Sequence, residues 1–119
     1  MGGSRAAQGQ GDTIAQKPWQ ASLVLDPLKT ATLQAPPGRI LVIETVGIGP
    51  GKTCRIRTST GGNQGEYFFR LSFDVTVQPF LTRLYADPGS TVEITSMDQW
   101  NQTSISLAGR AILATEFKP

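Results

Sequence analysis

The stretch GIGPGKT, residues 47–53, has nearly the composition of a nucleotide-binding loop. Such a loop needs a Gly five positions before the Gly of its Gly-Lys-Thr triplet, because the backbone amides must wrap the phosphates. Val46 occupies that position, and Pro50 removes one amide donor. The loop must also open a helix, whereas the alternating residues that follow, CRIRTST, predict a strand. We therefore interpret the stretch as a turn between two strands and not as a phosphate site.

The chain contains one Cys and no His. Without His, the usual proton shuttle at neutral pH and the commonest metal ligand are both missing. A single thiol forms neither an internal disulfide nor a thiolate cluster. Cys54 shares a strand face with Ile56, so we expect it to be a small buried core residue and not a nucleophile. These features argue against zinc chemistry and triad hydrolysis, and we expect no metal site, no cofactor and no catalytic residue.

Glu44 is the one carboxylate inside an apolar run, ILVIETV. A buried carboxylate has a raised pKa and can act as an acid, but in an alternating strand it can equally face a cross-strand Arg or the solvent. Glycoside hydrolysis also needs a second carboxylate facing the first. Asp74 and Glu93 are the candidates, and no sequence spacing pairs either with Glu44. We expect the protein not to be an enzyme.

Trp100 lies in a polar loop beside Asp98, Asn101 and Gln102. An aromatic ring on a loop can stack on a sugar ring, and neighbouring amides and a carboxylate can bind the hydroxyls. These four residues are the predicted ligand site, with glycan as the ligand. The alternative, favoured by the usual burial of large aromatics, is that Trp100 plugs one end of the core.

Arg55 and Arg57 project from one strand face and could bind an anionic ligand. Because Arg70, Asp74 and Glu93 also lie on predicted strands, cross-strand charge pairing is the simpler interpretation. The net charge is only +2 and the basic residues are scattered, which argues against nucleic acid as a partner. No apolar run approaches the roughly twenty residues that span a bilayer, so we expect no membrane insertion.

The elements that must position these residues begin after a polar arm. Residues 1–16 are rich in Gly, Ala and Gln and have almost no bulky apolar side chain, so alone they cannot offset the entropy of ordering. This arm is either a flexible leader or a segment that becomes ordered on a neighbouring subunit. Residues 17–119 form the one folded domain that this length allows.

Short apolar runs separated by turn signals at intervals of about eight to twelve residues predict an all-β domain. About eight antiparallel strands in this length predict a single β-sandwich, with a jelly roll favoured. An immunoglobulin-like sandwich is the alternative, although the Cys, Trp, Cys framework is missing. The predicted strands span residues 19–25, 30–35, 39–46, 52–60, 66–77, 81–86, 90–97 and 103–117. We expect 39–46 to be a central strand covered on both faces, and the last strand to bend at Gly109.

The strand predicted at 66–77 has the clearest two-residue period. Its core face comprises Tyr67, Phe69, Leu71, Phe73, Val75 and Val77. Phe68 lies on the opposite face, so a loop, the arm or another subunit must cover it. We therefore predict Phe68 as an interface residue and the protein as a homo-oligomer.

The segments PPGRILVIE, RLYADPGSTVEI and SLAGRAIL, within residues 36–114, resemble a pattern in small exported bacterial β-sandwich proteins of uncharacterised function. The resemblance implies an extracellular or surface-displayed location and supplies no catalytic residue. Taken together, the sequence predicts a non-catalytic, exported, homo-oligomeric binding module with carbohydrate as its favoured ligand class. The alternative is a structural or assembly subunit of a virion or surface layer, in which the jelly roll tiles and the N-terminal arm reaches a neighbour.

Overall fold

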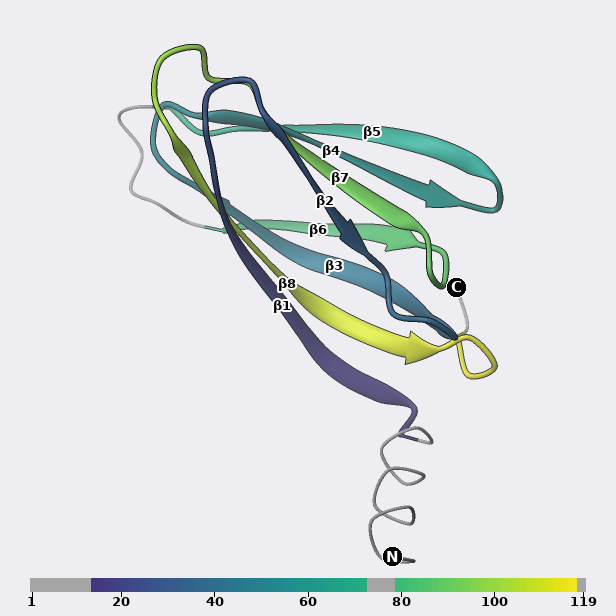
Figure 1. The fold of residues 1–119 in the computed structure, drawn as a ribbon. Helices are drawn as coiled ribbons and strands as arrows, with labels where there is room; N and C mark the ends of the chain where they lie inside the picture. The colour runs from purple at the N-terminus through teal and green to yellow at the C-terminus, as the bar shows by residue number, and fades with distance from the viewer. Residues whose placement is uncertain (1–13, 73–78, 118–119) are drawn as a thin grey trace, which may run out of the picture.

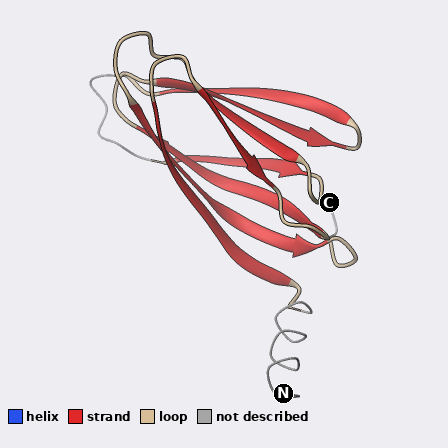
Figure 2. Ribbon diagram, in the orientation of Figure 1, coloured by secondary structure: helices blue, strands red, loops and turns tan. Residues whose placement is uncertain are grey.

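The computed structural model describes residues 14–72 and 79–117, which form strands and no helix (Figures 1 and 2). Several of the strands alternate in burial along their length, as expected where one face of a strand lies on a core. They are β1 (Gln16–Leu25), β2 (Thr30–Gln34), β3 (Arg39–Ile48), β4 (Thr53–Thr60), β5 (Asn63–Arg70), β6 (Phe80–Ala86), β7 (Thr91–Ser96) and β8 (Thr103–Leu113).

The strands form two four-stranded sheets whose strand pairs are antiparallel (Figure 1). One sheet has the order β1-β8-β3-β6 and the other β2-β7-β4-β5. Among the described strands, only β4 and β5 are both consecutive in the chain and in one sheet; the members of every other consecutive pair lie in different sheets. An immunoglobulin-like sandwich would place the first strand beside the second, whereas β1 pairs with β8. The predicted β-sandwich with jelly-roll order is therefore confirmed.

The core lies between the two inner sheet faces. Leu41, Ile43, Ile56 and Ile94 are completely buried there, and the remaining strands contribute further aliphatic side chains. Val42 points to the outer face of its sheet and is also buried. β3 lies between β8 and β6, and its consecutive residues Leu41, Val42 and Ile43 are all buried. The prediction of a central strand covered on both faces is therefore confirmed for residues 41–43.

A bulge interrupts β3 at Glu44, where the pairing with both β6 and β8 shifts register between Ile43 and Thr45. On β8 the residue opposite Ile43 is Gly109. A Cβ at Gly109 would overlap the carbonyl oxygen of Val42. The backbones of β3 and β8 therefore approach too closely at Gly109 for any side chain. The predicted bend of β8 at this residue stays a prediction.

Several strand boundaries differ from the sequence prediction. β1 begins at Gln16, which had been assigned to the arm, because the strand is paired with β8 as far as Ile112. β5 ends at Arg70, and the predicted core residues Phe73, Val75 and Val77 lie outside the described residues, as does Asp74. β8 ends at Leu113 instead of residue 117, because a turn follows in which the Glu116 amide donates to the Leu113 carbonyl.

The core face predicted for β5 is only partly correct. Phe69 and Leu71 are buried, but 40% of Tyr67 is exposed. Tyr67 lies on the inner face, opposite the buried Ile56, yet β5 is the last strand of its sheet. An inward side chain on an edge strand is covered from one side only.

Substitution of Gly109 by Ala should lower the free energy of unfolding by about 3 kcal/mol, because the new methyl group meets backbone atoms that cannot move independently. Gly47→Ala is a matched control, since its methyl group would meet the Ser106 hydroxyl, the end of a rotatable side chain. We expect that control to cost about 1 kcal/mol or less. Urea denaturation measures both, and equal costs would contradict the close-approach explanation.

Candidate functional site

Three connections meet at one end of the sandwich (Figure 1). They are the β1–β2 turn at residues 26–29, the β3–β4 turn at 49–52 and the β7–β8 loop at 97–102. Strands that cross from sheet to sheet bring these distant segments together. The predicted ligand site lies in the β7–β8 loop, so its geometry depends on how the other two connections hold that loop.

Asp98 fixes the backbone of the β7–β8 loop. Its Oδ1 accepts hydrogen bonds from the amides of Trp100 at 2.8 Å and Asn101 at 2.6 Å. Its Oδ2 accepts from Lys52 Nζ at 3.0 Å, which links the loop to the β3–β4 turn. The Asn101 amide, Lys52 and the Trp100 amide together lower the pKa of Asp98 to about 2. The carboxylate is therefore ionised at any physiological pH.

Further hydrogen bonds join the same three connections. The Leu28 amide donates to the Asp98 carbonyl at 3.1 Å, and Met97 donates to the Thr53 carbonyl at 2.9 Å. Gln102 Nε2 donates to Asp26 Oδ1 at 2.9 Å. The β7–β8 loop is thus bonded to both neighbouring connections through backbone and side chains, and it forms one unit with them.

Trp100 is 82% exposed at the tip of this loop. The interpretation that it plugs the end of the core is wrong. Ser96 and Thr103, both fully buried and hydrogen-bonded to each other at 3.1 Å, already close the core beneath the loop. The indole ring therefore faces solvent while its backbone is held in place.

The four predicted site residues have different roles. Trp100 and Asn101 are exposed at the loop tip. Asp98 uses both carboxylate oxygens within the protein, so it positions the loop instead of offering a free acceptor. Gln102 is exposed, but its side-chain nitrogen is bonded to Asp26. The structure therefore brings the four predicted residues together. Trp100 and Asn101 are available to contact a ligand, and Asp98 and Gln102 hold the loop in place.

Leu28, in the adjoining β1–β2 turn, was missed by the sequence prediction. Its φ is +60°, a left-handed conformation that no other described non-glycine residue adopts. It is the third residue of a turn closed by the Lys29 amide donating to Asp26, a position where positive φ normally selects Gly or Asn. Its side chain is 56% exposed. The available sequence signal was an Asp-Pro turn without Gly or Asn at the third position.

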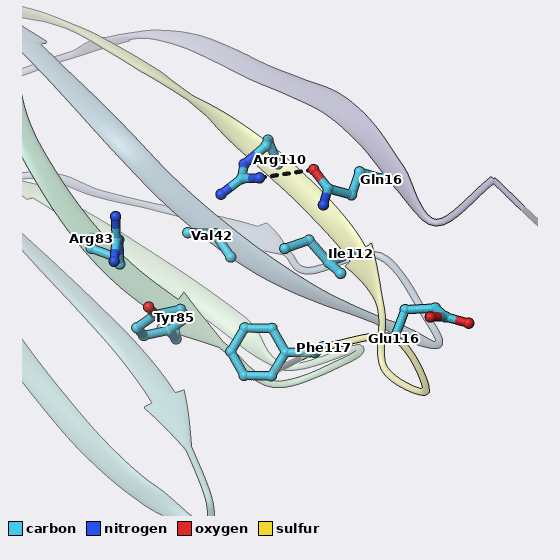
Figure 3. Close-up of a pocket in the computed structure, with 8 residues that line it drawn as sticks. All are labelled: Gln16, Val42, Arg83, Tyr85, Arg110, Ile112, Glu116 and Phe117. Carbon is cyan, nitrogen blue, oxygen red and sulfur yellow. Dashed lines mark hydrogen bonds between the residues drawn. The ribbon is translucent and has the colours of Figure 1, made fainter. Parts of the chain in front are cut away.

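Figure 3 shows a recess of about 320 Å³ on the outer face of the β1-β8-β3-β6 sheet. It lies near the C-terminal end of β8, whereas Trp100 lies before the first residue of that strand. The segment after β8 folds back there, and Phe117 packs edge-on against Tyr85 with ring centroids 5.5 Å apart. The outward-facing Val42 lies between its cross-strand partners Tyr85 and Arg110 and is buried. The lining residues are Gln16, Val42, Arg83, Tyr85, Arg110, Ile112, Glu116 and Phe117.

Arg110 in this recess is already engaged. It forms an ion pair with Glu44 at 3.1 Å and donates to Gln16 Oε1 at 2.8 Å, the bond drawn in Figure 3. Glu44 therefore faces a cross-strand Arg, which is one of the alternatives that the sequence allowed for its side chain. Glu93 lies in the other sheet, paired with Arg57, so these two carboxylates do not converge. The other candidate, Asp74, lies outside the described residues.

The remaining charged residues and the thiol have structural environments. Arg57 pairs with Glu93 at 3.3 Å and with Glu66 on its other side, so the predicted cross-strand charge pairing is confirmed for this residue. Cys54 is completely buried in the core, as predicted, and burial raises the pKa of its thiol to about 12. Across residues 14–72 and 79–117, no three His, Cys, Asp or Glu side chains gather in a way that could hold a metal ion.

Comparison with protein-family models gives no match to this chain, and comparison with curated proteins gives none either. The resemblance to exported bacterial proteins therefore stays a prediction. Among the described residues, no helix has the length and apolar character needed to cross a membrane.

Acid titration should reveal the role of Asp98. Its folded pKa of about 2 lies below the ordinary value of 3.8, so its contribution to stability is complete above about pH 4 and is lost as the pH falls towards 2. NMR should show the carboxyl carbon titrating near pH 2, together with shifts of the Trp100 and Asn101 amides. Asp98→Asn, which keeps an acceptor oxygen but no charge, should abolish this transition. A carboxyl that titrates near 3.8 would contradict the bonding described here.

The left-handed backbone of Leu28 should lower the free energy of unfolding of the protein. Leu28→Gly removes the strain of positive φ and should raise the free energy of unfolding by roughly 0.5–1 kcal/mol, even though it deletes a side chain. Leu28→Ala is the matched control, because it deletes the side chain and keeps the strain, so we expect no gain. Thermal and urea unfolding measure both variants. If Leu28→Ala raised the free energy of unfolding as much as Leu28→Gly does, backbone strain would not be the cause.

Proposed function

We propose that this protein is a non-catalytic binding module whose ligand surface is the loop end that carries Trp100. The observation that carries the proposal is an indole that is 82% exposed on a loop whose backbone is fixed by Asp98. Leaving so large an apolar ring in water forgoes roughly 1.5–3 kcal/mol of burial. A binding role accounts for that cost, since the ring is buried when the ligand is present.

The rigidity of the loop supports the same reading. Binding costs free energy when loops and side chains must be ordered. Here the Asp98 carboxylate, Lys52 and the hydrogen bonds to the β1–β2 turn hold the backbone in advance. The backbone strain at Leu28, in that same turn, is of the kind found at functional sites.

Carbohydrate is the ligand class that we favour. A sugar ring has an apolar face that stacks on indole and a rim of hydroxyls that bind amides. Gln99, Asn101 and Gln102 are all exposed in the same loop as Trp100, so amide groups that can bind hydroxyls are available beside the ring. A glycan-binding role also fits the extracellular or surface location that the resemblance predicts.

The second candidate is a structural or assembly subunit of a virion or surface layer. Capsid subunits and lectins both use the jelly roll, so topology does not separate the two functions. The observation that favours assembly is that large apolar side chains are also exposed on strands, outside the β7–β8 loop: Phe68 on β5 and Leu81 on β6. The arm that would reach a neighbour in this reading falls mostly within residues 1–13, which lie outside the described residues.

Trp100→Ala tests the binding proposal. On a glycan array, the wild type should bind a defined set of glycans, and the variant should lose at least roughly tenfold in affinity, equivalent to about 1.4 kcal/mol. Stability should stay within about 0.5 kcal/mol, because the ring makes little contact with the folded chain. Ile14→Ala, which removes an exposed apolar side chain at the opposite end of the sandwich, is the matched control and should leave glycan affinity unchanged.

A Trp19→Phe variant leaves Trp100 as the only tryptophan in the chain. Its fluorescence should shift to shorter wavelength when a bound glycan covers the ring. Absence of glycan binding by the folded wild type would overturn the carbohydrate assignment. Binding that survives Trp100→Ala would move the site elsewhere, with the recess beside Tyr85 and Phe117 the next surface to test.

A further inference from the structure

β5 (Asn63–Arg70) is an edge strand with one open side. It is the last strand in the order β2-β7-β4-β5, and among the described residues its other side pairs with no strand. Its pairing with β4 runs without a bulge from Arg70 opposite Thr53 to Asn63 opposite Thr60. Its sequence, NQGEYFFR, contains neither Pro nor Lys, which commonly protect edge strands from pairing with another chain. The edge is therefore long and regular, and neither Pro, Lys nor a bulge interrupts it.

The hydrogen bonds of Leu71, directly after β5, show which backbone groups point to that open edge. The Leu71 amide donates to Lys52 at 3.0 Å, and its carbonyl accepts from Gly51 at 2.7 Å, so both of its groups face the β4 side. Backbone groups alternate along an antiparallel strand. The odd-numbered residues of β5 therefore bond to β4, and the even-numbered residues from 64 to 70 direct their amides and carbonyls outwards.

The same even-numbered residues place their side chains on the outer face of the sheet. Phe68 lies opposite Arg55 there and is 61% exposed. Glu66 and Arg70 are both exposed on either side of it. Glu66 contacts Arg57 through one carboxylate oxygen, while Arg70 forms no ion pair within the described residues. The open edge thus presents a Phe between an acid and a base, each two residues away.

We propose that two copies of this chain pair antiparallel through β5, with the two-fold axis at Phe68. In this register Phe68 meets Phe68 of the partner subunit, and Glu66 lies opposite Arg70 of the partner subunit. Because the dimer has a two-fold axis, the ion pair between Glu66 of one copy and Arg70 of the other forms twice. The even-numbered residues, whose backbone groups point outwards, meet each other, so the backbone hydrogen bonds can form in the same register.

Charge selects this register over its neighbours. Sliding the pair by one repeat in one direction centres it on Tyr67, which places Arg70 opposite Gln64 and Glu66 opposite Phe68. Sliding it the other way centres it on Phe69 and places Arg70 opposite Phe68 and Glu66 opposite Ser72. Both alternatives leave the charges unmatched, and opposite charges directly across a strand pair are favourable. Only the register centred on Phe68 combines both ion pairs with aligned backbone groups.

The pairing also accounts for Tyr67. On the inner face it places Tyr67 opposite Phe69 of the partner subunit, which covers the side that the edge position leaves open. The result is one continuous sheet of eight strands, four from each copy. Because the strands run antiparallel, the two Trp100 ends face opposite directions and remain free, so the dimer is compatible with the proposed ligand surface but does not depend on it.

A charge-exchange experiment on the full chain tests this arrangement. Light scattering over a concentration series should give a dimer for the wild type. Arg70→Glu should place acids opposite acids and raise the dimer dissociation constant at least roughly tenfold, and Glu66→Arg should do the same with bases. A mixture of these two variants should restore the dimer, because each chain then supplies the charge that the other lacks. Lys29→Glu, a charge reversal in the distant β1–β2 turn, should leave the mass unchanged.

Phe68→Asp gives a second, independent test, because it places two carboxylates at the axis without disturbing the Glu66–Arg57 contact and should also give monomers. Hydrogen exchange identifies what covers the edge. Protection of the amides of residues 64, 66, 68 and 70 that increases with protein concentration supports pairing with a second copy. Protection of these amides that does not depend on protein concentration, in a protein that is monomeric, would show that the N-terminal arm covers the edge. The proposal would also be overturned if the wild type were a monomer. A dimer that none of the three β5 variants weakens would overturn it as well.

Discussion

Each strand of this protein has one apolar face, and those faces are removed from water only when the two sheets stack. Completely buried aliphatic residues such as Ile43 and Ile56 come from opposite sheets and share one core. Because nearly every connection crosses between the sheets, the turns collect at the two ends of the sandwich. Stacking therefore determines which distant loops become neighbours, and the candidate ligand surface is a consequence of the core.

At one of those ends, a single carboxylate converts three neighbouring connections into one rigid surface. Asp98 bonds to two amides of its own loop and to Lys52 of another, while Leu28 and Asp26 of a third bond to the same loop. With Ser96 and Thr103 closing the core beneath, the Trp100 ring has no space inside. The ring is exposed because other side chains already occupy the end of the core. Because Asp98 fixes the backbone of the loop, the exposed ring has a defined position from which it can bind a ligand.

The surfaces of the sandwich are covered unequally. At the opposite end from Trp100, the segment after β8 folds back over the outer face of its sheet, so that Phe117 packs on Tyr85. β5 has no comparable protection within the described residues. Its exposed Phe68 lies between Glu66 and Arg70, a pattern that is self-complementary only when two strands run antiparallel. Binding at the loop end and association at the edge use separate surfaces, so one fold can serve both.

Local pattern was sufficient to predict a sandwich of about eight strands and the buried Cys54, because alternation and turn residues depend on neighbouring positions. It favoured a jelly roll, but the strand order that identifies this topology comes only from the tertiary structure. The same reasoning placed Trp100, Asp98, Asn101 and Gln102 in one loop. It failed for β1, which begins earlier than expected because pairing with β8 extends it, and for Tyr67, whose exposure comes from an edge position. Nor could it separate Trp100 as a contact residue from Asp98 as its support, or detect the strain at Leu28. Those distinctions require knowing which loops lie side by side, and only the stacking of the two sheets decides that.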